Sequence, residues 1–164
     1  MTERTIAVAG ASGFIGRHLV RRLRDRGYRV RALTRRPASL GIPEVETRYA
    51  DVLDGATLPS ALEDVDTAYY LVHSMEDRSK GSFVERDRRA ADHFVRAAEQ
   101  AGVSRIVYLG GLGETGPGLS EHLASRAEVG RILQSGAPST TVLRAAIILG
   151  PGGASWDRLR QLVA

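Results

Sequence analysis

The sequence has no cysteine among its 164 residues, and Lys80 is its only lysine. The lack of cysteine excludes disulfide bonds and thiolate chemistry, and it fits a protein of the reducing cytoplasm. The chain also lacks any apolar run near the roughly 20 residues that span a bilayer, and its N-terminus has no signal-peptide core. We therefore expect no membrane span and a cytoplasmic location.

Aromatic residues are scarce, at 5% of the chain, whereas arginine supplies almost all of the positive charge behind the net charge of +4. Many arginines lie between Arg17 and Arg36, a concentration that is compatible with nucleic-acid binding. The region lacks the interleaved series of aromatic residues on which bases stack. We interpret these arginines as the solvated face of a helix and the surroundings of the next strand, and we expect no nucleic-acid partner.

The remaining composition, 43% hydrophobic and 26% charged, is that of an ordinary globular protein. A chain of this length can form one domain that buries about two-thirds of the surface exposed in the unfolded state. We therefore predict a single domain over residues 1–164.

A glycine-rich stretch near the N-terminus, VAGASGFIG at residues 8–16, organises the rest of the sequence. An apolar run at residues 5–9 precedes it and apolar residues at helical spacing follow it, so the glycines mark a turn from strand to helix. Gly10 permits a tight turn, Gly13 allows the backbone to approach a diphosphate, and Gly16 lets the helix pack closely. The free N–H groups and the positive end of the helix would bind the phosphates, although a glycine-rich turn that binds nothing is the alternative. The predicted contacts are Gly10, Ser12, Gly13, Phe14, Ile15 and Gly16.

The second expected strand, residues 28–34, ends without a carboxylate. In a fold that prefers NAD(H), an Asp or Glu at this position binds the ribose hydroxyls. This chain has Thr34 followed by Arg35 and Arg36, and a guanidinium can bind a 2′-phosphate through two hydrogen bonds. We therefore predict that Arg35 and Arg36 favour NADP(H), with NAD(H) as the alternative cofactor. Without a ligand, the two arginines would only solvate a loop before Pro37.

Segments of strand and helix character alternate along the whole chain. This alternation predicts an α/β fold with a doubly wound parallel sheet, the Rossmann fold, in strand order 3-2-1-4-5-6. The expected strands are residues 5–9, 28–34, 45–50, 68–72, 105–109 and 140–149; helices are expected at 56–62, 83–101, 120–134 and 156–163, and loops at 75–82 and 114–119. Because the C-terminal ends of parallel strands share one sheet edge, the residues that follow the strands should meet in one crevice. These residues are Gly10, Arg35, Asp51, His73, Gly111 and Gly150.

The Gly-x-x-Gly-x-x-Gly spacing resembles that of the extended and atypical branches of the short-chain dehydrogenase/reductase superfamily. The phrases YYLVHSM (69–75), ERDRRAA (85–91), YLGGL (108–112) and HLASR (122–126) resemble a narrower group, atypical members akin to NmrA and to uncharacterised bacterial NAD(P)-binding proteins. The resemblance implies that Asp51 and Val52 lie beside the adenine. The remaining predicted cofactor contacts are Leu71, Val72, His73, Gly110, Gly111 and Arg126.

Members of that group continue well beyond the end of this chain, with a substrate-binding part and often a C-terminal domain of the DUF2867 type. The resemblance therefore implies that the chain is truncated before its substrate-binding part. A sheet edge left uncovered in this way would permit homo-oligomers.

Most short-chain reductases use a Ser at the end of the fifth strand and a Tyr-x-x-x-Lys at the start of the next helix. In this sequence Gly110 and Gly111 stand at the serine position. His122 and Arg126 stand at the tyrosine and lysine positions, four residues apart on one helical face. Arg126 can hold the ribose, and His122, which titrates near neutrality, can act as the general acid. The alternative is that His122 only caps the helix or packs at its start.

Two functions from different classes are compatible with these residues. The first is an NADP(H)-dependent oxidoreductase acting on a carbonyl or quinone-like small molecule. The second is a non-catalytic, redox-sensing module of the NmrA type that binds NADP(H), and the loss of the Ser, Tyr and Lys favours it. A nucleotide-sugar epimerase also requires the missing Tyr and is therefore less favoured.

Overall fold

The computed structural model describes residues 4–73, 83–112 and 120–163. Within these ranges a six-stranded, all-parallel sheet has the order β3-β2-β1-β4-β5-β6, which confirms the predicted Rossmann-type α/β fold. The strands are β1 (Thr5–Ala9), β2 (Arg29–Thr34), β3 (Glu46–Tyr49), β4 (Val65–Tyr70), β5 (Arg105–Gly111) and β6 (Ser139–Ala145). Because all strands run in the same direction, the segments that follow them begin at one edge of the sheet.

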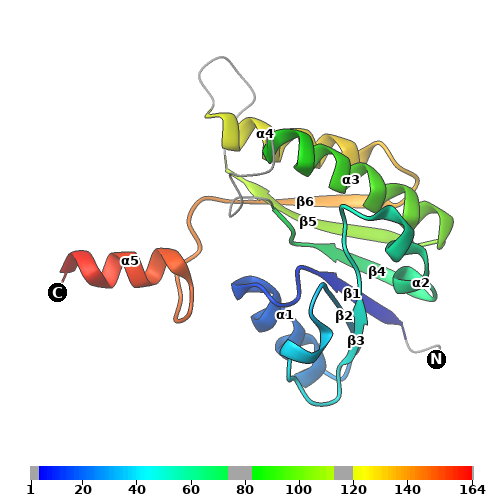
Figure 1. Ribbon diagram of the computed structural model, residues 1–164, viewed down its shortest axis with the longest axis horizontal. Coiled ribbons are helices and arrows are strands. Elements are labelled where there is room, and N and C mark those ends of the chain that lie inside the picture. The colour runs from blue at the N-terminus through cyan, green and yellow to red at the C-terminus, as the bar shows by residue number, and fades with distance from the viewer. Residues whose placement is uncertain (1–3, 74–82, 113–119, 164) are drawn as a thin grey trace.

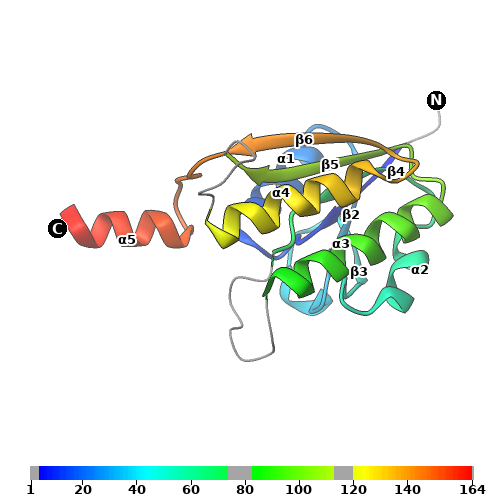
Figure 2. The ribbon, with the colours of Figure 1, turned by 90° about the horizontal axis from the view of Figure 1, so that it is seen from above.

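Helices cover both faces of the sheet. In Figures 1 and 2, α1 lies on one face, α2, α3 and α4 lie on the other, and α5 extends away from the sheet. The helices are α1 (Phe14–Asp25), α2 (Leu58–Leu62), α3 (Phe83–Gln100), α4 (Glu121–Gln134) and α5 (Ala154–Val163), with short 3-10 helices η1 (Pro37–Ser39) and η2 (Gly55–Thr57). None of the helices in the described ranges combines the length and apolar character needed to cross a bilayer.

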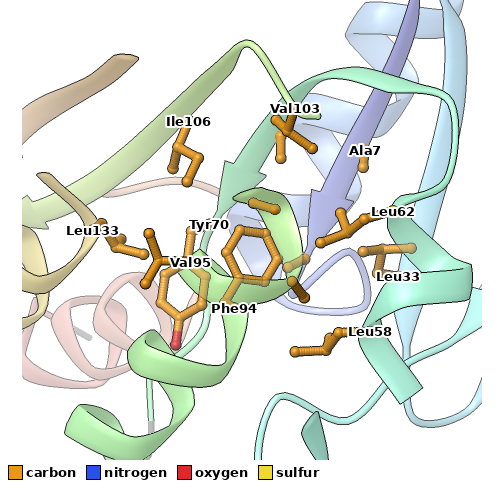
Figure 3. Close-up of a cluster of buried hydrophobic side chains, with 14 of the residues drawn as sticks. Ala7, Leu33, Leu58, Leu62, Tyr70, Phe94, Val95, Val103, Ile106 and Leu133 are labelled. Carbon is orange, nitrogen blue, oxygen red and sulfur yellow. The ribbon is translucent and has the colours of Figure 1, made fainter. Parts of the chain in front are cut away.

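Two apolar clusters, one on each face of the sheet, form the core. Alternate residues of β1 enter different clusters, since Ile6 and Val8 pack towards α1 while the residues between and after them pack towards α2, α3 and α4. Figure 3 shows part of the larger cluster, in which the rings of Tyr70 and Phe94 meet edge to face with centroids 4.9 Å apart. β1 and nearly all of β2 are therefore buried on both sides, as parallel strands usually are, whereas β4 and β5 also carry half-buried residues.

Several helix ends carry residues that favour such ends. The Asp54 side chain accepts a hydrogen bond from the Ala56 N–H and begins η2. The Ser120 hydroxyl oxygen accepts from the Leu123 N–H and begins α4. Gly102, with φ of +70°, directly follows the last turn of α3. Short polar side chains at the first position and glycine after the last thus define these helices.

Several strand boundaries differ from the sequence prediction by one or two residues, and two of them differ by more. β4 begins at Val65 rather than residue 68, because the strand continues through two half-buried polar residues that interrupt the apolar run. β6 ends at Ala145 rather than residue 149, because its neighbour β5 ends opposite it at Gly111. The predicted loops at residues 75–82 and 114–119 lie outside the described residues.

Candidate functional site

The turn between β1 and α1 is held closed by glycines. Gly10 has φ of +82°, and a Cβ at this position would lie 3.0 Å from the backbone C and O atoms of Leu71, just after β4. A Cβ at Gly16 would lie 2.1 Å from the carbonyl oxygen of Gly10, far inside van der Waals contact. These two glycines therefore let the start of α1, the turn and the end of β4 pack backbone against backbone.

Gly13 differs from the other two glycines of the motif because its own backbone does not require glycine. Its φ is −71°, and a Cβ there would meet only the carbonyl oxygen of Gly10 within 4 Å, at 3.3 Å. Gly13 is also the N-cap residue of α1, which has no side-chain cap and no acidic residue in its first turn. The described structure thus leaves the N–H groups and positive end of α1 available to an anion, with an uncrowded approach at Gly13.

A cavity of about 760 Å³ lies directly beside this turn. It extends from the glycine turn across the ends of β2 and β3 to the end of β4 and the first half of α3. Several predicted cofactor contacts line it, namely Gly10, Ser12, Gly13, Arg35, Arg36, Asp51, Val52, Val72 and His73. Residues from the ends of four different strands are therefore brought together in one cavity.

The segment after β3 is fixed by a local hydrogen-bond network. The Asp51 carboxylate accepts a hydrogen bond from the Leu53 N–H at 3.0 Å, and the Asp51 N–H donates to the Thr57 hydroxyl oxygen at 3.0 Å. From α3, the His93 Nδ1 lies 3.1 Å from the Val52 carbonyl oxygen, which can only accept, so His93 carries its proton on Nδ1. This network holds Asp51 and Val52 in place on the cavity wall.

The other predicted site residues, both cofactor contacts and catalytic candidates, do not line the cavity within the described residues. They are Phe14, Ile15, Gly16, Leu71, Gly110, Gly111, His122 and Arg126. The Phe14 ring instead packs under the turn that follows β6, since a Cβ at Gly150 or at Gly153 would lie 3.0 Å from it. The Phe14 ring therefore packs against this turn and does not line the cavity.

A second group of predicted residues gathers at the end of β5 and the first turns of α4. Arg126 donates a hydrogen bond to the Leu109 carbonyl oxygen, and its guanidinium carbon lies 5.8 Å from the centroid of the Tyr108 ring. The Tyr108 hydroxyl donates to the Arg126 carbonyl oxygen at 3.1 Å. A Cβ at Gly111 would lie 2.8 Å from the Leu123 side chain, so the glycine makes room for α4 at the strand end. The structure thus brings Gly111 and Arg126 together at the end of β5.

His122 is half-buried on the same face of α4. Burial lowers the pKa of His122 below its ordinary value of 6.5, and the positive charge of Arg126 lowers it further, whereas the charge of Asp87 acts in the opposite direction. Asp87 is itself buried between α3 and α4, where the Ser125 hydroxyl donates to its carboxylate at 3.3 Å. At neutral pH the His122 imidazole is therefore mostly neutral. Burial also raises the pKa of Tyr108 to about 12, so its hydroxyl keeps its proton.

Sequence reasoning missed several residues that line the cavity, above all Arg17, Arg86 and Arg89. Arg17 follows Gly16, and the sequence alone predicts it on the solvated helix face. Its guanidinium instead donates to the Ser12 carbonyl oxygen at 3.2 Å and to the Leu40 carbonyl oxygen at 3.0 Å, which joins the glycine turn to the segment after η1. Arg86 and Arg89 lie in the phrase ERDRRAA, whose helical spacing places both on one face of α3.

Comparisons with known proteins agree with this geometry. Residues 10–147 match the family described as NAD(P)H-binding. The ceramide reductase of Caulobacter vibrioides is 30% identical over 163 residues, which cover 97% of this chain and 51% of that protein. The 3 beta-hydroxysteroid dehydrogenase/Delta 5→4-isomerase of Mycobacterium tuberculosis is 30% identical over 112 residues, covering 63% of this chain and 30% of that protein.

The fold has counterparts among solved structures. The Bordetella bronchiseptica enzyme WbmH in complex with NAD+ superposes with a TM-score of 0.79 at 18% identity, covering 96% of this chain and 62% of that one. At this identity the likeness concerns the fold. The chain spans about half the length of the first curated relative and a smaller share of the second.

Proposed function

Because the chain belongs to the NAD(P)H-binding family, we propose that it binds NADP(H) in preference to NAD(H), in the cavity beside the glycine turn. The observation that carries the proposal is the uncapped N-terminus of α1 opening into a cavity whose β2 side carries Arg35 and Arg36. No carboxylate stands at the end of β2, where one would repel a 2′-phosphate.

The residues present fit a dinucleotide. A cavity of about 760 Å³ falls in the range of roughly 300–1,000 Å³ that is usual for ligand sites. The N–H groups around Gly13 would hold the diphosphate, and Arg35 and Arg36 the 2′-phosphate. Asp51 and Val52, held by the network described above, would contact the adenine. Val72 and His73 would lie beside the middle of the cofactor, as the end of β4 does in this fold.

We further propose an oxidoreductase activity on a carbonyl or quinone-like substrate. A bound nicotinamide would supply or accept a hydride. Arg126, which donates to the Leu109 carbonyl oxygen and lies beside Gly111, would hold the ribose, while His122 would exchange a proton with the substrate oxygen. The names of the relatives, a reductase of ceramide and a dehydrogenase of 3 beta-hydroxysteroids, support hydride chemistry as the class of reaction.

A second candidate is a non-catalytic NADP(H)-binding module of the NmrA type. The observation that favours it is the chemistry at the end of β5, where glycines replace the serine of most short-chain reductases and an arginine replaces the lysine. The high pKa of an arginine does not allow proton exchange, and the lowered pKa of His122 leaves few protonated imidazoles at neutral pH. Such a module would respond to NADP(H) binding through a partner rather than by turnover.

Two measurements test these proposals in sequence. Titration with NADPH and NADH should give binding of both, with the tighter dissociation constant for NADPH. Absence of binding to folded protein would remove the whole proposal. Oxidation of NADPH, followed at 340 nm with quinones and aldehydes, then separates the two candidates, because tight binding without turnover across the panel favours the non-catalytic module.

A further inference from the structure

Two arginines of α3, Arg86 and Arg89, line the cavity, whereas two others form ion pairs on the surface of the helix. Arg88 forms ion pairs with Glu85 at 3.0 Å and with Glu128 at 2.8 Å. Arg96 pairs with Asp92 at 3.1 Å. Arg89, by contrast, lines the cavity and forms no ion pair with the described residues.

The position of Arg89 along α3 relates it to the part of the cavity wall that we propose to contact the adenine. It lies four residues before His93, on the same helical face and one turn nearer the start of α3. His93 contacts Val52, and Val52 follows the strand that pairs with β2. Arg35 and Arg36 thus approach this region from the end of β2, and Arg89 approaches it from α3.

Positive charge predominates among the described residues of the cavity wall. Five arginines line the cavity and Asp51 is the single carboxylate among its described lining residues. Arg17 is engaged with two backbone carbonyl oxygens, whereas Arg35 follows β2 and Arg89 lies on α3, and both are exposed. A phosphate monoester carries a charge of about −1.5 to −2 at neutral pH. A 2′-phosphate would therefore bring negative charge to the arginines that line the cavity.

We propose that Arg89 is a specificity-determining residue, which binds the cofactor's 2′-phosphate from α3 while Arg35 and Arg36 bind it from the end of β2. This inference rests on the proposed NADP(H) binding, and it assigns the cofactor preference to two elements instead of one. Because Arg89 is exposed, solvent weakens its interaction, and the expected contribution is about five- to tenfold in affinity.

The test compares Arg89→Ala with Arg96→Ala in the full 164-residue chain. Arg96 is an exposed arginine on the same helix outside the cavity, so its replacement is the matched control. Each variant is titrated with NADPH, NADH, 2′,5′-ADP and ADP. Arg89→Ala should weaken NADPH and 2′,5′-ADP by about five- to tenfold and leave NADH and ADP within about twofold, whereas Arg96→Ala should change none of them.

Two results would overturn the inference while leaving the proposed function intact. One is unchanged NADPH binding in Arg89→Ala, which would exclude a contact with the cofactor. The other is an equal loss for NADPH and NADH, which would assign Arg89 to the adenine or the diphosphate instead. Failure of the unaltered chain to bind any of the four nucleotides would overturn the proposed function and this inference together.

Discussion

Alanine at Gly16 should lower the stability of the protein, whereas alanine at Gly13 should weaken NADPH binding, although the two glycines belong to one motif. At Gly16 the new Cβ would stand 2.1 Å from the Gly10 carbonyl oxygen and 2.8 Å from the Ala11 Cα. Both neighbours are backbone atoms, so α1 must move by about an ångström to relieve the overlap. We expect a loss of about 3 kcal/mol of unfolding free energy. At about 2–4 °C per kcal/mol for a chain of this size, the midpoint of thermal unfolding should fall by about 6–12 °C.

At Gly13 the new Cβ would meet only the Gly10 carbonyl oxygen at 3.3 Å, and φ of −71° is open to alanine. The small crowding is offset by the reduced entropy of the unfolded chain, so stability should stay within about 1 kcal/mol. In the proposed complex, the methyl group would nevertheless stand between the diphosphate and the N–H groups of α1. We expect NADPH to bind at least about tenfold more weakly, a difference of about 1.4 kcal/mol.

Thermal unfolding and isothermal titration with NADPH distinguish the two variants. Gly13→Ala should unfold near the temperature of the unaltered chain and bind poorly, whereas Gly16→Ala should already be destabilised without ligand. Normal NADPH affinity in Gly13→Ala would refute the assignment of the diphosphate to this turn. Unchanged stability in Gly16→Ala would refute the packing argument.

Three further predictions concern charge. Arg35→Ala should reduce the preference for NADPH over NADH by about tenfold, as judged from the two dissociation constants, and an unchanged ratio would remove the assignment of Arg35 to the 2′-phosphate. If His122 donates the proton in carbonyl reduction, kcat/KM should fall as pH rises through a pKa below 6.5, because only the protonated imidazole can donate. A pH profile of kcat/KM centred above that value, or one that is unchanged in His122→Ala, would contradict this role. Arg31→Met should lower the free energy of unfolding, measured in urea, by about 2–4 kcal/mol. The reason is that the buried Arg31 donates hydrogen bonds to the carbonyl oxygens of Ala61 and Glu63 and to the Glu46 carboxylate. An unchanged midpoint of unfolding would show that these acceptors find other donors.

The order of the sheet could be predicted because each strand carries its own signal in a few adjacent residues. The apolar run before Gly10 and the alternation after Gly27 depend only on local sequence, and parallel connections allow few arrangements. The start of β4 was less predictable, because polar residues follow Val65. Their place in the strand is decided by pairing with β1, which is distant in sequence.

In the candidate site, too, some residues could be predicted from local sequence and others could not. Residues that directly follow strands, such as Arg35 and Asp51, line the cavity because the topology leads them there. Arg89 and Arg17 lie on helices, where the facing direction depends on how each helix is rotated against the sheet. Helical periodicity identifies which residues share a face, but an arginine facing solvent and one facing a cavity have the same spacing. These side chains could be assigned only once the helices were packed.

The glycine turn and the arginines around it use different parts of the polypeptide, and this separation has a consequence for engineering. At Gly10 and Gly16 the glycine turn packs backbone against backbone, so it tolerates few substitutions. The residues that would discriminate between NADPH and NADH are instead the exposed arginine side chains of the cavity wall, Arg35 and Arg89. Substitutions that aim to switch the cofactor preference can therefore be made at these arginines while the glycine turn is left unchanged.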